Sequence, residues 1–285
     1  MSNGLEDFKI SGRRHIWRIQ RNFSGWDSPP QAGKEPGAGG NSLDMKVAAY
    51  QAPLLASGSM SALDLVRAQV RRCEAESVSI LCCPEAILGG LADYSENPAQ
   101  FAIKSDDGQL ASVLDGLASD TVTSIVGFTE LASSGILFNA AVILHQGKLA
   151  GIYRKLHPAI RHSVYTAGSQ TPVFRTGQLT FGVVICNDSN YAEPARRMAA
   201  QGASILFVPA NNALPAERES SELIAKATEA DVARSVENRI WVVRADVAGS
   251  NGELTCHGSS EIVDPQGNVV QHGELLTSEL LVVDI

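Results

Sequence analysis

The chain has 285 residues, 44% hydrophobic content and a formal net charge of −8, so it is long enough for one large domain or two small ones with a buried core. The negative charge argues against a nucleic-acid-binding protein, and no apolar run reaches the ~18 to 20 residues that a membrane-spanning helix needs. Its five cysteines are an odd number without disulfide or zinc spacing, which indicates free thiols, no metal site and a reducing, cytoplasmic setting.

Residues 1–44 differ in composition from the rest of the chain. They contain a Gly- and Pro-rich run from Gly33 to Gly40, and such a stretch buries too little apolar surface to offset the entropy lost on ordering. The sequence therefore predicts a disordered extension over 1–44 and one domain over 45–285. A short basic docking helix around Arg13, Trp17 and Arg21 is the alternative for this extension.

From Met45 onward, short apolar strands alternate with helices whose apolar residues fall on one face. Strands are expected over 46–51, 79–84, 123–129, 139–145, 148–154, 180–187, 204–209, 241–247, 260–263, 269–270 and 280–284. Helices are expected over 60–73, 109–117, 193–201 and 219–238. Strands mixed with helices, together with a hairpin at Gln146-Gly147, indicate an α/β protein with mixed sheets.

Three polar side chains that can take part in chemistry follow apolar strands at the point where each strand ends. Glu85 follows 80–84, Lys155 follows 149–154, and Cys186 follows 181–185. Sites in α/β folds assemble at strand ends, because the scaffold is rigid there and the loops are free to vary. A cysteine between a strand and a helix also lies near backbone N–H donors, which favour the thiolate. A lone cysteine is ordinarily a small buried residue, so the interpretation depends on all three together.

The segments around these residues resemble the nitrilase superfamily of carbon–nitrogen hydrolases. The principal matches are Pro-Glu-Ala-Ile-Leu-Gly-Gly at 84–90, Tyr-Arg-Lys-Leu-His-Pro at 153–158 and Val-Ile-Cys-Asn-Asp at 184–188, with further matches at 138–141, 234–238, 258–259 and 263–267. They follow the family's order from about Met45 to the C-terminus. The resemblance implies a four-layer α-β-β-α sandwich with two mixed sheets, assembled as a homodimer or a higher homo-oligomer.

The resemblance also implies a division of chemical roles. Cys186 would attack the carbonyl or nitrile carbon and form a thioester-type intermediate. Glu85 would take the thiol proton and later activate water. Lys155 and the backbone N–H of Asn187 would stabilise the oxyanion. A small-molecule substrate and water are then sufficient, and no metal or organic cofactor is required.

One feature of the family is missing from its usual stretch. Members usually carry a second glutamate between the lysine and the cysteine, which orients the lysine and contacts the substrate, but 156–185 contains no Asp or Glu. Glu130, at the end of the 123–129 strand, is the candidate carboxylate from elsewhere. Arg161, which lies in the stretch without acidic residues, could instead recognise an acidic substrate. A weakened or inactive site is the third interpretation.

These observations favour an amidase-type hydrolase of a small amide or N-carbamoyl compound, with Asn211 expected in a loop at the pocket. The alternatives are a nitrile hydrolase, and a non-catalytic binding or regulatory protein on the same fold. The sequence does not identify the substrate.

Overall fold

The computed structural model describes residues 45–59, 61–106, 108–159, 162–215 and 220–285. The expectations for 1–44 and for Arg161 therefore lie outside the described residues. All described residues belong to one compact unit that runs from Ser42 to Ile285.

The larger sheet has ten strands among the described residues and is built around a central parallel core. Its order is β10 (Leu214–Pro215), β13 (Leu254–Cys256), β12 (Val247–Ser250), β1 (Lys46–Pro53), β2 (Val78–Cys82), β4 (Thr123–Leu131), β5 (Leu137–His145) and β6 (Lys148–Arg154), with β16 (Glu279–Asp284) also paired to β1 and β3 (Ile103–Lys104) to β4. β12, β1, β2 and β4 run parallel, while β5 and β6 add the expected antiparallel hairpin.

The smaller sheet has six strands in the described part of the chain. Its order is β15 (Val269–His272), β14 (Glu261–Val263), β11 (Trp241–Ala245), β9 (Ile205–Pro209), β8 (Leu179–Val183) and β7 (Val173–Thr176). β8, β9 and β11 are parallel, β7 and β14 run antiparallel to them, and β15 runs antiparallel to β14. Both sheets are thus mixed, as the sequence predicted.

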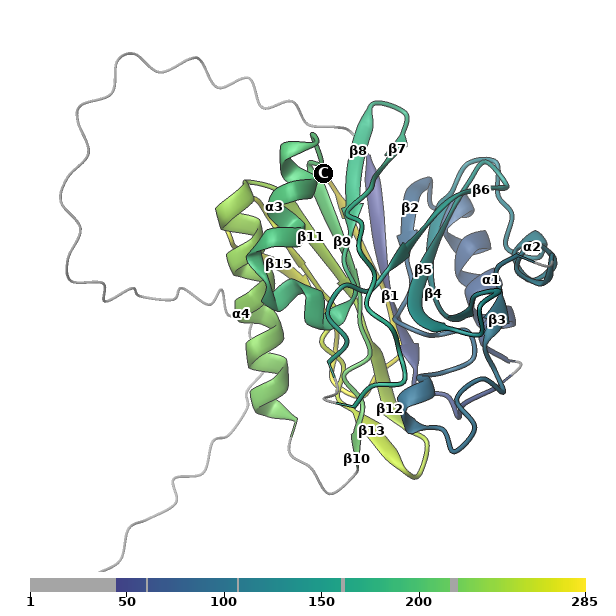
Figure 1. The fold of residues 1–285 in the computed structure, drawn as a ribbon. Coiled ribbons are helices and arrows are strands. Elements are labelled where there is room, and N and C mark those ends of the chain that lie inside the picture. The colour runs from purple at the N-terminus through teal and green to yellow at the C-terminus, as the bar shows by residue number, and fades with distance from the viewer. Residues whose placement is uncertain (1–44, 60, 107, 160–161, 216–219) are drawn as a thin grey trace, which may run out of the picture. The chain divides into compact units, whose positions relative to one another are not determined.

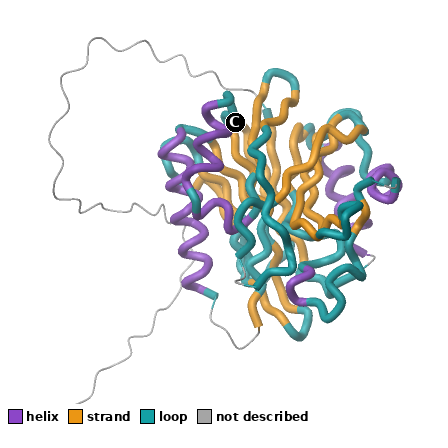
Figure 2. The backbone as a smooth tube through the Cα atoms, in the orientation of Figure 1, coloured by secondary structure: helices purple, strands orange, loops and turns teal. Residues whose placement is uncertain are grey.

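Helices cover the outer face of each sheet (Figures 1 and 2). α1 (Ser61–Ala75) and α2 (Gln109–Asp115) lie on the larger sheet, and α3 (Ala192–Ala200) and α4 (Ser221–Asn238) lie on the smaller one. α1 packs through Ala62, Val66, Val70 and Cys73, which recur at helical spacing and are buried. The four-layer α-β-β-α sandwich is confirmed.

The core between the sheets explains why the adjacent cysteines do not pair. Cys82 packs in the cluster that contains Phe181 and Phe207 of the smaller sheet, whereas Cys83 packs in the cluster that contains α1. Successive side chains of an extended strand point to opposite faces. The expected separation of the two thiols is confirmed, and both remain free.

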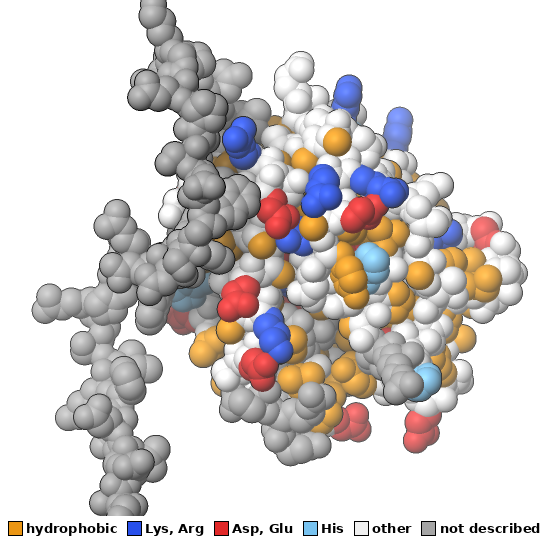
Figure 3. All heavy atoms as spheres, turned by 60° about the vertical axis from the view of Figure 1, so that its left-hand side comes forward, with side chains coloured by type: hydrophobic (Ala, Val, Ile, Leu, Met, Phe, Trp, Pro, Cys, Tyr) orange, Lys and Arg blue, Asp and Glu red, His pale blue; other side chains and the backbone are white. Residues whose placement is uncertain are grey.

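The outer face of α3 and α4 carries mixed charges. Acidic and basic side chains lie near one another on the face in Figure 3. On α3 and α4, Glu193 pairs with Arg197 and Glu222 pairs with Lys226, each one helical turn apart. Exposed pairs of this kind contribute little to stability. The two charges of each pair do neutralise one another.

The single strand expected over 241–247 is wrong. The chain leaves the smaller sheet after Ala245 and enters the larger one at Val247. Asp246 lies between the two strands, and its carboxylate accepts a hydrogen bond from the N–H of Val247 at 2.8 Å. In one continuous strand, that N–H would bond to a neighbouring strand instead. The strand expected over 180–187 is also too long, because β8 ends at Val183.

Candidate active site

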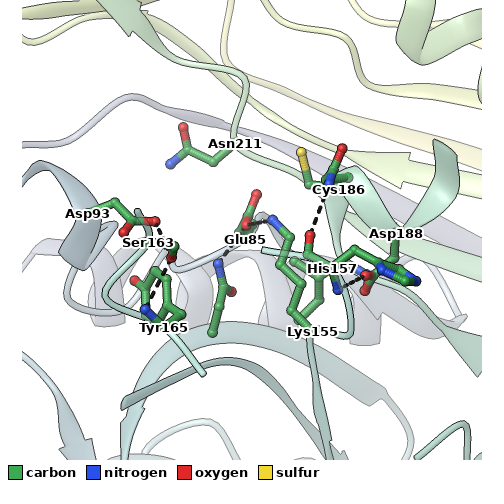
Figure 4. Close-up of polar contacts among 12 residues, drawn as sticks. Glu85, Asp93, Lys155, His157, Ser163, Tyr165, Cys186, Asp188 and Asn211 are labelled. Carbon is green, nitrogen blue, oxygen red and sulfur yellow. Dashed lines mark hydrogen bonds and ion pairs between the residues drawn. The ribbon is translucent and has the colours of Figure 1, made fainter. Parts of the chain in front are cut away.

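The loops that follow β2, β6, β8 and β9 meet around a cavity of about 660 Å³ (Figure 4). Glu85, Lys155, Cys186, Asn211 and Asn212 all line it. The loops are tied directly to one another and to the sheet: the N–H of Glu85 donates to the carbonyl of Ala210 at 3.1 Å, and the N–H of Lys155 donates to that of Asn139 at 2.8 Å. The three strand ends identified in the sequence therefore converge on one space.

Glu85 and Lys155 form a buried ion pair. Lys155 Nζ lies 2.5 Å from Glu85 Oε1, and Asn139 Nδ2 donates to the same oxygen at 2.6 Å. Burial by itself would lower the pKa of Lys155, but the Glu85 carboxylate and the Cys186 sulfur outweigh it and raise that pKa above its ordinary value. The ammonium group is therefore retained inside the cavity at neutral pH.

Cys186 lies in a backbone conformation that is uncommon for a side chain with a Cβ. Its φ is 45°, in the left-handed region, and it begins the short 3-10 helix η2 (Cys186–Asn190) directly after the strand segment. Such conformations persist where the surrounding structure enforces them, and they are found at active sites. The turn leaves Cys186 half-buried, while the other four cysteines of the chain are buried.

The thiol is neutral in the resting site. Burial and the nearby Glu85 charge raise the pKa of Cys186 to about 12, against the opposing effects of Lys155 and Arg244. A thiol with this pKa needs a base before it can act as a nucleophile. Its sulfur donates to Asn212 Oδ1 at 3.4 Å.

Asp188 joins the lysine loop to the cysteine loop. Its carboxylate accepts hydrogen bonds from the Tyr153 hydroxyl at 2.8 Å, from the N–H of His157 at 2.7 Å and from the N–H of Ile185 at 3.0 Å. Asp188 is fully buried. It therefore fixes the positions of the chain around Lys155 and around Cys186 relative to each other.

Asp246 and Ser259 fix the side-chain amide of Asn212, which contacts the sulfur. Asn212 Nδ2 donates to Ser259 Oγ at 2.9 Å and to Asp246 Oδ2 at 3.2 Å, and its backbone N–H donates to Asp246 Oδ1 at 3.1 Å. These bonds turn Oδ1 of Asn212 toward Cys186. The sequence interpretation chose Asn211 from this loop; Asn211 does line the cavity, but Asn212 is the residue that contacts the thiol.

A buried guanidinium lies beneath the nucleophile. Arg244 donates twice to Asp231, at 2.6 Å each, and once to Ser189 Oγ at 2.9 Å. Ser189 Oγ in turn donates to the carbonyl of Cys186 at 3.0 Å. Arg244 and Asp231 are 1% and 0% exposed, so the pair forms a rigid support behind the cysteine turn. No feature of the sequence motifs indicated this support.

The remaining expected residues have different outcomes. Asn187 lines the cavity and its side chain donates to the carbonyl of His157 at 3.0 Å. Glu130 does not bond to Lys155: both of its oxygens accept from Arg154, at 2.6 and 2.7 Å. Adjacent residues along an extended chain point to opposite faces, so a carboxylate that faces Arg154 faces away from Lys155. The expectation that Glu130 lies beside the lysine is wrong.

The described ranges contain neither a cluster of metal ligands nor a membrane-spanning helix. No group of three or more His, Cys, Asp or Glu side chains there lies close enough together to hold a metal ion. No helix within the same ranges is long and apolar enough to cross a bilayer.

The carbon-nitrogen hydrolase family model matches residues 46–285, and the chain belongs to this family, the nitrilase superfamily. It is 30% identical over 232 residues to the "Hydrolase in pqqF 5'region" of Pseudomonas protegens, which covers 79% of this chain and 77% of that protein. It is 28% identical over 208 residues to the 2-oxoglutaramate amidase of Bacillus subtilis, which covers 70% of this chain and 75% of that one.

The fold is also similar to that of a solved member of the superfamily. An amidase from Nesterenkonia superposes with a TM-score of 0.72 at 23% identity, covering 85% of this chain and 92% of that one. The likeness supports the layered architecture described above.

Proposed function

We propose that the chain is a cysteine-dependent hydrolase that cleaves the C–N bond of a small non-peptide amide or N-carbamoyl compound. The observation that carries the proposal is the convergence of Glu85, Lys155 and Cys186 on one cavity, with the carboxylate and the ammonium paired at 2.5 Å. These are a base, a fixed positive charge and a nucleophile.

The reaction begins from the neutral thiol. Glu85 removes the proton of Cys186 as the sulfur attacks the carbonyl carbon, which gives a tetrahedral oxyanion. The Lys155 ammonium and the backbone N–H of Asn187 stabilise that charge. Glu85 then returns the proton to the departing nitrogen, so that ammonia leaves and a thioester remains.

Water completes the cycle. Glu85 deprotonates a water molecule, the hydroxide attacks the thioester carbon, and the carboxylic acid leaves as the thiol is re-formed. Overall, one amide and one water give one acid and one ammonia. A raised pKa at Lys155 favours this scheme, because the lysine must keep its charge in both tetrahedral intermediates.

The relatives support the choice of an amide. Both the Bacillus subtilis protein and the Nesterenkonia protein are amidases by name. A nitrile hydrolase is the second candidate, and the same nucleophile would serve it. The proposal also includes a cytoplasmic location and the assembly that the resemblance implies, a homodimer or a higher homo-oligomer, whose mass light scattering of the purified chain would measure.

A panel of amides, ureido acids and nitriles, assayed for ammonia release, tests the function. We expect release from at least one amide or ureido acid, and loss of that release in Cys186→Ala with the fold intact by circular dichroism. Cys73→Ala is the matched control: Cys73 is a buried residue of α1 in the outer core cluster, and its loss leaves turnover in place. Continued turnover by Cys186→Ala on a verified substrate would overturn the proposal.

A non-catalytic binding protein on this fold remains the competing function, since no second carboxylate bonds to Lys155 among the described residues. It would release no ammonia from any member of the panel. Its Cys186 would also react with iodoacetamide no faster than the buried Cys73 and Cys256.

A further inference from the structure

The cavity has a second carboxylate on the side away from the nucleophile. Asp93 belongs to the short 3-10 helix η1 (Ala92–Tyr94) and lines the cavity. Figure 4 shows Asp93 and Ser163 on one side of Glu85 and Cys186 on the other. A substrate placed against Cys186 and Glu85 would therefore extend toward Asp93.

Asp93 is fixed by the stretch that contains no acidic residue of its own. Its Oδ2 accepts from Ser163 Oγ at 3.0 Å, and its Oδ1 accepts from the N–H of Val164 at 2.8 Å. The Ala92 N–H donates to the Tyr165 hydroxyl at 2.7 Å, which ties the two loops together a second time. The carboxylate is thus brought to the 156–185 segment from a different loop.

Asp93 has no cationic partner in the described part of the chain. Both of its donors are uncharged, and no Lys or Arg pairs with it in the described part of the chain. The cations that line the cavity already have carboxylate partners: Lys155 is bound to Glu85, Lys226 to Glu222, Arg234 to Glu237 and Arg244 to Asp231. A carboxylate has about four acceptor positions, so those not used by the two loop donors can accept a hydrogen bond from a ligand.

Tyr165 lines the cavity beside the loop that carries Asp93. Burial, with smaller contributions from the charges of Glu85 and Asp93, raises the pKa of Tyr165 to about 12. The Tyr165 hydroxyl also bonds to Thr129 Oγ1 at 2.7 Å, which holds the ring in the cavity wall. Glu85, Asp93 and Tyr165 therefore all line one polar cavity.

We propose that Asp93 is the second acidic group of the pocket, a specificity-determining residue that accepts a hydrogen bond from the N–H of a carboxamide or ureido substrate. The inference rests on the proposed hydrolase function and narrows its substrate class. A carboxylate can only accept, and it finds a donor in an amide but none in an ester or a nitrile. The departing nitrogen also gains a proton in the transition state, where a nearby negative charge stabilises it further.

The test compares two substrates that share one acyl group, a primary amide from the panel and its methyl ester. In Asp93→Asn we expect kcat/KM for the amide to fall on the order of 10- to 100-fold, the loss typical of a charged hydrogen bond, while ester hydrolysis is largely unchanged. Ser163→Ala, which removes one anchor and keeps the charge, preserves the amide-to-ester ratio. The double variant Asp93→Ser/Ser163→Asp exchanges the two hydrogen-bonded side chains, so that the carboxylate comes from position 163. We expect it to restore part of the amide-to-ester ratio.

Each contrary result has a separate meaning. An equal loss for ester and amide in Asp93→Asn would show that Asp93 only holds its loop, and unchanged rates for both would show that it does not contact the substrate. A native chain that cleaves the ester but no amide also overturns the inference. A native chain that cleaves neither would instead overturn the hydrolase function on which the inference rests.

Discussion

Replacing Glu85 by Gln should have opposite effects on two properties of Cys186. The carboxylate raises the pKa of the thiol, second only to burial, while Lys155 and Arg244 lower it. Removing the negative charge therefore lowers the pKa of Cys186 and leaves the lysine charge without its partner. The thiol becomes easier to deprotonate, although the enzyme has lost the base that the reaction needs.

The size of both effects follows from the geometry of the site. Glu85 and Lys155 are 2% and 4% exposed, so solvent screens these charges weakly, and a like charge beside an acid shifts its ionisation about tenfold or more. A less basic thiolate is a weaker nucleophile, with a Brønsted slope of about 0.4 to 0.5. A tenfold rise in the thiolate fraction therefore raises the alkylation rate by about 3-fold. Loss of the general base costs amide turnover about 10²- to 10⁴-fold.

The assay is the rate of iodoacetamide modification at pH 7.5, followed by intact mass, beside ammonia release from the same preparations. Cys186→Ala gives the background, which we expect to be near zero because the other four cysteines are buried. Slower alkylation in Glu85→Gln than in the native chain would refute the reasoning, since Glu85 would then be maintaining a thiolate in the resting enzyme.

Three further outcomes concern the support of the site. Asp231→Asn leaves the buried charge of Arg244 unpaired and should lower the free energy of unfolding by about 3 to 5 kcal/mol in urea titrations; an unchanged midpoint would contradict a structural role for the pair. Gly127→Ala places a Cβ within 2.8 Å of Glu85 Cα and should cost kcat roughly 100-fold through displacement of the base; native kcat would show that the loop yields freely. Burial and the nearby Asp231 raise the pKa of Glu261 to about 8, so the folded chain holds a proton that the unfolded chain releases above its ordinary pKa, and stability contributed by this group falls as pH rises from about 4.3 to 8. Glu261→Gln should remove that slope in unfolding free energy measured from pH 5 to 8, and an identical slope in both proteins would contradict the assignment.

The sequence was sufficient for features that depend on local pattern. Apolar runs located the strands, and the polar residue after each run located Glu85, Lys155 and Cys186. Alternation along an extended chain predicted that Cys82 and Cys83 face opposite layers, and the two core clusters confirm it.

Features that depend on strand pairing could not be read from the same pattern. Glu130 was assigned to Lys155 by its place at a strand end, but its partner depends on how β4, β5 and β6 are aligned, and that alignment brings Arg154 to it. The orientation of the Asn212 side chain depends on hydrogen bonds to Asp246 and Ser259, which are distant from it in sequence. One signal in the sequence did point to Asp246. It is the single acidic residue in the apolar stretch 241–248, and such a residue indicates a break in the strand.

The identity of the nucleophile is tested most directly by trapping the acyl-enzyme. A substrate found in the panel would be mixed with the native chain, quenched in acid within one turnover, and analysed by intact mass and peptide mapping. We expect a mass increase equal to the acyl group, located on Cys186 and absent from Cys186→Ala. An adduct on a different residue, or turnover that continues in Cys186→Ala, would contradict the assignment of Cys186 as the nucleophile.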